Sequence, residues 1–329
     1  MAFLATLLFG FVPMFIFAYI LYWLDRYEKE PIPLLIGVFL WGMLVAAGGA
    51  FIINTIFGIT VFAMTGSEVA SDFATGSFSA PFVEEALKGM AVLLVFLIFR
   101  REFDSILDGI VYAGIAALGF AATENVLYIW RGFDSGGWNG LFQLALIRVV
   151  LVGWQHPLYT AFTGIGLAVA RTNRSVLLKF IAPLLGFGLA MFTHAFHNTM
   201  AEIPFFGELT CVVGSFLDWF GVLFMFLVIV WATWVEQRNL INHLREEVQL
   251  GLISPAQYRT ACSAWAQALA RLSSLFGGSY PSTSRFYQVC GELAHKKQQL
   301  LTNGDESGNA AIIQRYRAEL LHLSPAALA

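Results

Sequence analysis

Long, uninterrupted apolar runs constrain this chain more than any other feature of its sequence. They recur through the first 234 residues with few charges inside them, and each is at least as long as the roughly 20 residues that an α-helix needs to cross a bilayer. Strands of a membrane barrel would instead show short segments of alternating polarity. The sequence therefore predicts an all-α, polytopic transmembrane helix bundle.

The composition supports this fold class. Of the 329 residues, 58% are hydrophobic and 12% are charged, and the mean hydropathy is +0.69, whereas a soluble domain carries about 25% charged residues. The formal net charge of −3 gives no reason to expect a nucleic-acid partner. An ordinary soluble enzyme is excluded, and nucleic-acid binding is not expected.

Seven apolar segments are long enough to span a membrane, at about residues 2–24, 33–60, 80–99, 105–130, 140–169, 176–200 and 211–234. The first is too long for the apolar core of a signal peptide, so we expect it to be retained as a span. Lys and Arg residues in short loops mark the cytoplasmic side. The loops after the first, third and fifth segments hold seven of them, and the opposite loops hold only Arg131. We therefore predict about seven spans, with the N-terminus outside and the C-terminus in the cytoplasm.

The sequence becomes abruptly polar after residue 234, and nine of the nineteen basic residues lie beyond this point. We predict two domains, a transmembrane protease-like domain at residues 1–234 and a cytoplasmic helical appendage at residues 235–329. The appendage is predicted to regulate or dock and to carry no catalytic residue.

Local signals predict the helices of this appendage. Ser254, Pro255 and Gln257 have the spacing of a capping box, which opens a helix. We expect this helix to reach about residue 274. Glycine-rich and polar stretches then leave two shorter helices, near residues 285–301 and 309–322.

The third apolar segment carries Glu84, Glu85 and Lys88 within about one helical turn. Each charge near the centre of a bilayer costs roughly 2.5 to 3.5 kcal/mol, so these groups must be paired, hydrated or bound to metal. Glu84 and Lys88 are four residues apart and share a helix face, so we predict a salt bridge that supports Glu84 and leaves Glu85 free. The alternative is a helix end whose charges are solvated among the lipid headgroups.

Further polar residues lie in the next three segments, namely Glu124, His156, His194, His197 and Asn198. With the predicted orientation, all three glutamates and His194 lie in the outer half of the membrane, and His156 lies near its middle. A lone intramembrane histidine usually makes a packing hydrogen bond. Three histidines together with three glutamates favour one shared site instead.

Imidazole and carboxylate groups together are what Zn²⁺ takes at a catalytic site, usually with three protein ligands and one water. A further glutamate can act as general base on that water. The chain lacks a helix-borne H-E-x-x-H motif, so the ligands would have to come from separate helices.

The order of these motifs resembles the PrsW family of intramembrane metalloproteases, which are relatives of the CAAX-processing and bacteriocin-immunity membrane proteases. The resemblance rests on Glu84-Glu85-x-x-Lys88, on Phe120-x-x-x-Glu124 followed by Asn125, and on the later histidines His156 and His194. Residues 25–31 and 108–112 are also similar to the family, and the resemblance covers about residues 1–234.

This resemblance implies an endopeptidase of the bacterial cytoplasmic membrane. Its substrate would be a membrane-anchored protein cleaved near the outer face of the bilayer, such as an anti-sigma-factor-type regulator. The predicted topology places the charged cluster on the same side.

On this basis we predict that Glu124, His156 and His194 bind a divalent metal, with Zn²⁺ as the expected ion. Glu84 or Glu85 would activate water, and either could instead be a ligand. The remaining roles fall to Lys88, which would orient or neutralise one of that pair, and Asn198, which would donate a hydrogen bond to the developing oxyanion. His197 competes with His194 as the active imidazole.

Two other functions compete with a protease. Buried Glu, His and Lys also mark ion pathways, so a proton- or cation-coupled transporter is the main alternative. The chain shows no inverted repeat of the kind found in many transporters. A protease requires the six groups to converge on one point, whereas an ion relay requires them to be strung between the two faces. A non-catalytic scaffold would leave the six groups unexplained.

Overall fold

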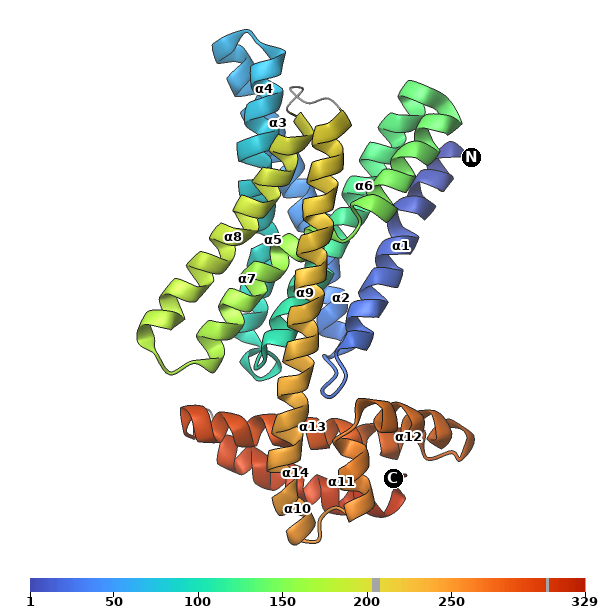
Figure 1. Ribbon diagram of the computed structural model, residues 1–329, viewed down its shortest axis with the longest axis vertical. Helices are drawn as coiled ribbons and strands as arrows, with labels where there is room; N and C mark the ends of the chain where they lie inside the picture. Colours follow the sequence, from blue (N-terminus) through green and yellow to red (C-terminus); the bar gives the residue numbers. More distant parts are fainter. Residues whose placement is uncertain (203–207, 306–307, 329) are drawn as a thin grey trace. The chain divides into compact units, whose positions relative to one another are not determined.

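The computed structural model describes residues 1–202, 208–305 and 308–328, and over these residues it is helical without strands (Figure 1). Five of the described segments are apolar and long enough to cross a membrane, judged by length and composition. The prediction of an all-α, polytopic membrane bundle is confirmed. The chain divides into two compact units. Unit 1 comprises Met1–Trp23, Glu30–Arg171 and Val176–Leu227, and unit 2 comprises Leu24–Lys29, Thr172–Ser175 and Val228–Ala329.

The helices that build unit 1 are α1 (Ala2–Leu24), α2 (Ile32–Leu40), α3 (Ala47–Thr65), α4 (Glu68–Ala74), α5 (Ala80–Ile98), α6 (Ile106–Ala145), α7 (Gln155–Thr172), α8 (Val176–Glu202) and the first part of α9 (Glu208–His243). Three π-helical turns interrupt or extend them, namely η1 (Trp41–Ala46), η2 (Thr75–Ser79) and η4 (Leu146–Leu151). Such turns often occur near functional sites.

A glycine reverses the chain inside α6, between the fourth and fifth predicted spans. Gly137 has φ 60° and ψ −145°, a conformation that residues with a Cβ rarely adopt. The two legs then run side by side, because Arg148 Nε donates to Asn125 Oδ1 at 2.9 Å. The reversal falls between the predicted spans at residues 105–130 and 140–169. The second of these is not one helix, because η4 ends at Leu151 and α7 begins at Gln155.

The first half of α6 is the centre of unit 1, and every residue from 107 to 122 is buried. Glycines allow its neighbours to approach closely. A Cβ on Gly164 of α7 would lie 2.0 Å from the Gly109 carbonyl oxygen, and one on Gly119 would lie 2.1 Å from the Phe39 carbonyl oxygen of α2. Small residues of this kind are how membrane helices pack. This packing fixes Glu124, one turn further along α6, against α7.

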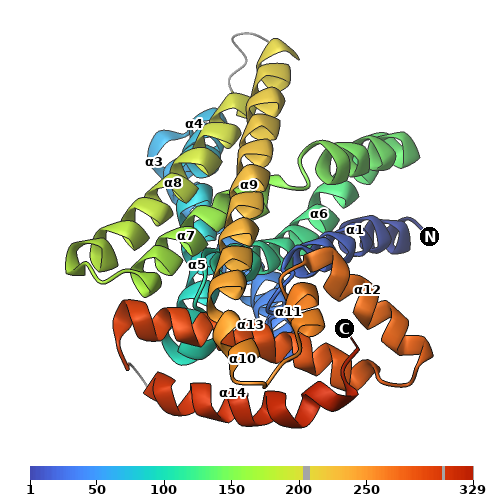
Figure 2. The same ribbon diagram turned by 60° about the horizontal axis from the view of Figure 1, so that its bottom comes forward.

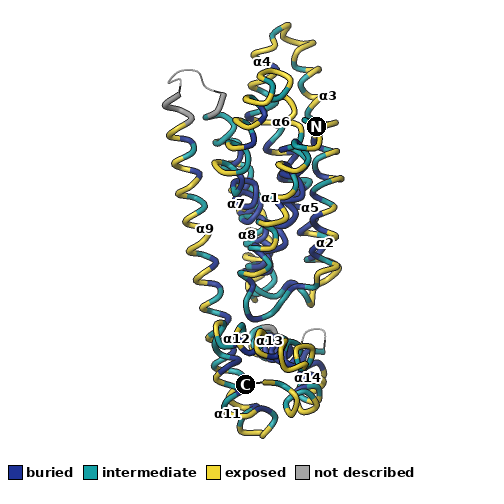
Figure 3. Tube along the Cα trace, turned by 90° about the vertical axis from the view of Figure 1, so that its right-hand side faces the viewer, coloured by how far each residue is buried: buried dark blue, intermediate teal, exposed yellow. Residues whose placement is uncertain are grey.

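The surface of unit 1 fits a lipid environment. Exposed residues follow the outer helices, including α3 (Figure 3), and many are large and apolar, such as Ile59, Leu184 and Phe216. The N-terminus, the α3–α4 connection and the turn at Gly137 lie at one end of unit 1, and the α5–α6 connection lies at the other (Figure 1). The predicted orientation places the first of these ends outside the cell.

Unit 2 is helical and has its own core. It contains the end of α9 followed by α10 (Arg245–Gln249), α11 (Pro255–Ala261), α12 (Ala264–Phe276), α13 (Tyr280–Asn303) and α14 (Asn309–Leu323) (Figure 2). Buried side chains of α9, α13 and α14, including Leu240, Phe286, Leu293 and Leu320, pack together. Because α9 runs unbroken past residue 234, the division into domains at that residue stays a prediction.

The helix predicted from Ser254 to about residue 274 is two helices. The capping box itself is confirmed, because Ser254 Oγ accepts from Gln257 N at 3.1 Å and Gln257 Oε1 accepts from Ser254 N at 2.9 Å. The helix ends at Ala261. Ser263 then accepts from Ala266 N and begins α12. A second serine cap, which the sequence pattern alone did not single out, causes the break.

Candidate metal centre

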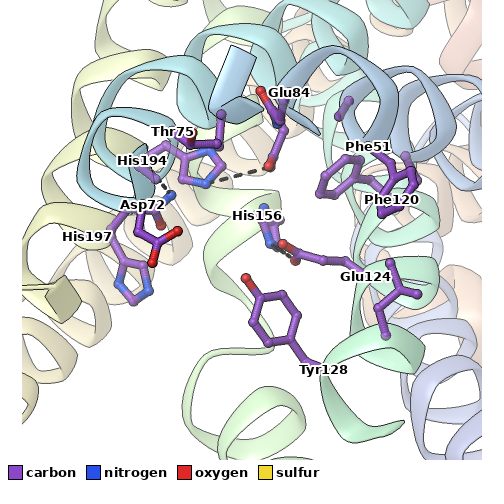
Figure 4. A pocket seen from close by; sticks show the side chains of 18 of the residues that line it. Phe51, Asp72, Thr75, Glu84, Phe120, Glu124, Tyr128, His156, His194 and His197 are labelled. Carbon is purple, nitrogen blue, oxygen red and sulfur yellow. Dashed lines mark hydrogen bonds and ion pairs between the residues drawn. The ribbon is translucent and has the colours of Figure 1, made fainter. Parts of the chain in front are cut away.

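A cavity of about 1090 Å³ lies in unit 1 between α3, α4, α5, α6, α7 and α8 (Figure 4). Its wall is unusually polar for the interior of a membrane bundle. The ionisable residues that line it are Asp72, Glu84, Glu124, Tyr128, Arg131, Arg148, His156, Tyr159, His194 and His197. Charged groups inside a membrane segment usually line a functional cavity.

Glu84, His156 and His194 converge from α5, α7 and α8. One ligand atom of each lies within 4.8 Å of the others, and all three residues are buried. Glu84 Oε2 makes no hydrogen bond, and His194 Nε2 lies 3.8 Å from it. A buried carboxylate oxygen without a hydrogen bond requires an explanation. Together with two imidazoles, it forms a donor set that fits a divalent ion such as Zn²⁺.

Glu85 contacts His194 through the ring nitrogen that does not face Glu84. It is fully buried and accepts from Thr160 Oγ1 at 2.8 Å, while its Oε1 lies 2.9 Å from His194 Nδ1. His194 Nδ1 is therefore occupied, which leaves Nε2 directed towards Glu84. A carboxylate on the far nitrogen is the usual support of a metal-binding histidine, because it fixes the tautomer and the ring orientation.

Lys88 pairs mainly with Glu85, which reverses the predicted roles of the two glutamates. Lys88 Nζ lies 2.5 Å from Glu85 Oε1 and 3.8 Å from Glu84 Oε2. The predicted ion pair between Glu84 and Lys88 is present but long, whereas the prediction that Glu85 is left free was wrong. Glu85 is the supported carboxylate, and Glu84 is the one that keeps an unbonded oxygen. Lys88 Nζ also lies 3.2 Å from His156 Nδ1 and 4.4 Å from the centre of the Phe120 ring.

Glu124 approaches His156 from α6. Its Oε2 lies 2.8 Å from His156 Nε2 and also pairs with Arg148. Arg148 in turn lies 4.4 Å from the centre of the Tyr128 ring. Arg148 was not singled out from the sequence, although an arginine inside the apolar run at residues 140–169 was a visible signal.

Asn198 lies on the wall of the cavity but outside this network, with Nδ2 donating to the Gly76 carbonyl oxygen at 2.9 Å. The other predicted residues are linked in one cluster, in which Glu84, Glu85, Lys88, Glu124, His156 and His194 are neighbours. The cluster converges on a single place and is not strung between the two ends of the bundle.

These features define a class of protein. It is a polytopic helical membrane protein in which carboxylates and imidazoles from four helices meet at a buried centre suited to a divalent metal, beside a large polar cavity.

A family model described as PrsW family intramembrane metalloprotease matches residues 30–233. This match covers more than half of the chain, and the chain belongs to that family. The resemblance drawn from the motifs is confirmed, and the family description implies a divalent metal.

The chain is similar to curated relatives named Protease PrsW, and three of them are compared with it below. The protein from Geobacillus kaustophilus (strain HTA426) is 35% identical over 140 residues, which are 43% of this chain and 55% of the relative. The protein from Oceanobacillus iheyensis is 32% identical over 171 residues, covering 50% of this chain and 71% of the relative. The protein from Clostridioides difficile (strain 630) is 33% identical over 141 residues, covering 43% and 55%. In two of these three the matched part spans little more than half of the relative's length. No solved structure matches the chain.

Proposed function

We propose that this protein is a metal-dependent membrane endopeptidase that cleaves a membrane-anchored protein. The observation that carries the proposal is the buried, unbonded Glu84 oxygen beside His156 and His194. Family membership supports the same reaction class.

Glu84, His156 and His194 would hold the metal, because their ligand atoms lie within 4.8 Å of one another. When bound, a divalent ion such as Zn²⁺ polarises the scissile carbonyl group and lowers the pKa of a water. Glu85 would fix the His194 ring through its contact with Nδ1. Lys88 would offset the negative charge of this centre, since its ammonium group touches both Glu85 and His156.

This arrangement gives Glu124 the role of general base, which would take a proton from the attacking water. Arg148 would hold the Glu124 carboxylate in place. Prediction from the sequence assigned Glu124 as a ligand and Glu84 or Glu85 as the base, with either of these two as an alternative ligand. Glu84 is the better-placed ligand, because it groups with His156 and His194 within 4.8 Å and its Oε2 is not hydrogen-bonded.

Asn198 would donate a hydrogen bond to the developing oxyanion from the wall of the cavity. Its Nδ2 carries two hydrogens, and the contact with the Gly76 carbonyl oxygen uses only one of them.

The substrate would be a membrane-anchored regulator, such as a protein of the anti-sigma-factor type, cleaved near the outer face. Two features support this placement. The cavity is lined by residues of α4, including Asp72. The α3–α4 connection lies at the end of unit 1 that the charge pattern places outside.

The test compares Glu84→Gln with Glu124→Gln in purified, detergent-solubilised protein. We measure bound zinc by elemental analysis and cleavage of a quenched, fluorescent single-span peptide. Glu84→Gln should lose both zinc and cleavage, whereas Glu124→Gln should keep zinc and lose cleavage. The reverse pattern of zinc loss would restore the assignment made from the sequence. Wild-type protein without zinc or cleavage would favour a transporter that uses the same groups.

A further inference from the structure

A second polar cluster lies in unit 1 outside the metal centre, around a carboxylate on α9. Asp218 is buried and interacts with two helices. Its Oδ2 accepts from Gln155 Nε2 at 2.7 Å and lies 2.6 Å from His197 Nδ1, and its Oδ1 accepts from Tyr159 Oη at 3.2 Å. A carboxylate within an apolar helix is costly unless it is paired. Asp218 was visible in the seventh apolar segment and was not singled out there.

All three partners of Asp218 line the cavity, and His197 is the most exposed of them. The His197 side chain is 23% exposed, whereas Gln155 and Tyr159 are 4% and 1% exposed. Because Nδ1 faces Asp218, Nε2 is the free end of the ring. No side chain among the described residues hydrogen-bonds to it. A purely structural link between helices would not require a partly exposed imidazole.

His197 also lies close to the metal centre. The Tyr159 ring stacks on His194 at 5.0 Å between centroids and lies 6.2 Å from the His197 ring. His194 and His197 both line the cavity, and Figure 4 shows them on the same side of it. A substrate bound at the metal centre would therefore share one cavity with His197.

Peptide hydrolysis requires an acid that can give a proton to the leaving amine. An amine leaves a tetrahedral intermediate only if its nitrogen is protonated as the bond breaks, and a positioned acid commonly supplies that proton. The basic groups already described do not fit this role. Lys88 is fully buried between Glu85 and His156, and an arginine such as Arg148 does not release its proton in a protein. A histidine whose far nitrogen contacts a carboxylate is well suited, because the carboxylate stabilises the imidazolium form.

We propose that His197, held by Asp218, is the general acid that protonates the leaving amine. This inference rests on the proposed endopeptidase function. In this step the C–N bond breaks and its electron pair passes to the amine nitrogen, which takes the proton from His197 Nε2. The imidazolium becomes neutral imidazole, and the acyl part leaves as the carboxylic acid. Solvent then returns a proton to His197, while the base releases to solvent the proton it took from water.

The test exploits leaving groups that differ in their need for a proton. The first probe is a quenched single-span peptide, whose amide requires an acid, and the second is an N-acyl-alanine 4-nitrophenyl ester, whose phenoxide leaves without one. In His197→Gln, amide cleavage should fall by roughly 10² to 10⁴-fold while ester cleavage and bound zinc stay at wild-type levels. Asp218→Asn should produce the same split to a smaller extent. His243→Gln in unit 2, whose Nε2 contacts Gln298, is the matched control and should change neither rate.

Two outcomes would overturn the inference. In the first, His197→Gln cleaves the amide at the wild-type rate. In the second, the variant loses amide and ester cleavage to the same extent, which indicates a structural role. Asp218→Asn separates these cases if His197→Gln does not fold. Wild-type protein that holds zinc but cleaves neither probe would overturn the proposed function itself.

Discussion

Glu247 in unit 2 and Glu84 in unit 1 are both buried glutamates, but they differ in how completely their carboxylate oxygens are hydrogen-bonded. In unit 2, Glu247 is fully buried and both of its oxygens are bonded to cations. Lys297 Nζ donates to Oε1 at 2.7 Å, and Arg317 donates to both oxygens at 2.9 and 3.0 Å. In unit 1, Glu84 is also buried, but its Oε2 makes no hydrogen bond and lies 3.8 Å from Lys88 Nζ.

The difference separates a carboxylate with a structural role from one that is available to bind a cation. A buried charge that is fully paired holds its surroundings together, and removing one partner is costly. A buried carboxylate that lacks a partner costs free energy in the folded state, so a bound cation is its natural complement. Glu85 belongs with Glu247 in this respect, although it lies next to Glu84 in the sequence.

The largest loss of stability is expected for Glu85→Ala. This change removes the nearest carboxylate from the fully buried Lys88 ammonium group and leaves it Glu84 at 3.8 Å, so it should cost about 3–5 kcal/mol. Thermal unfolding of the full chain in detergent, followed by circular dichroism, measures the effect. A melting temperature equal to that of the wild type would contradict the structural role of Glu85.

A somewhat smaller loss is expected for Glu247→Ala in unit 2. The change leaves Lys297 and Arg317 without their main partner, but both cations are partly exposed and keep Glu246, so we expect about 2–3 kcal/mol. Hydrogen exchange of the amides in α13 and α14 reports this local stability. Bound zinc should not change. Loss of zinc in this variant would break the distinction between the two units.

Arg148→Gln should have a moderate effect. Arg148 and Glu124 are partly buried, with side chains 16% and 18% exposed, so losing this pair and the bond to Asn125 should cost about 1–2 kcal/mol. Since Arg148 holds Glu124, peptide cleavage should fall while zinc is retained. Unchanged cleavage with a lower melting temperature would limit Arg148 to a structural role.

The smallest change in the stability of metal-free protein is expected for Glu84→Gln, within about 1 kcal/mol of the wild type. Glu84 Oε2 has no hydrogen bond to lose. The variant should instead lose the stabilisation that metal provides, because a ligand that binds only the folded state raises its stability. A chelator should therefore lower the melting temperature of the wild type and leave that of Glu84→Gln unchanged. A chelator effect of equal size in both proteins would exclude Glu84 as a ligand.

The first span was predictable because the bilayer itself fixes its length, and the apolar run at residues 2–24 matches α1. The capping box at Ser254 was predictable because its bonds are local. The choice of Lys88 between Glu84 and Glu85 was not. Both glutamates are within its reach on one helix, and the choice depends on Thr160 and His194 from other helices.

The sequence identified the site residues as candidates, but it did not identify the contacts that they make. Intramembrane charge identified Glu84, Glu124, His156 and His194. The same signal was present at Arg148 and Asp218, but their meaning depends on partners 24 and 63 residues away, Glu124 and Gln155. Such partners follow from how the two legs on either side of Gly137 align and from the packing of α9, neither of which the apolar pattern specifies.

Metal content tests the central claim most directly. Wild type, His156→Ala and His194→Ala are purified in detergent and their bound zinc is measured by elemental analysis, with His243→Ala of unit 2 as the matched control. The expected result is close to one zinc per chain in the wild type and the control, and almost none in the two cavity variants. Wild-type protein without bound metal, or zinc retained in both cavity variants, would contradict a metal centre at Glu84, His156 and His194.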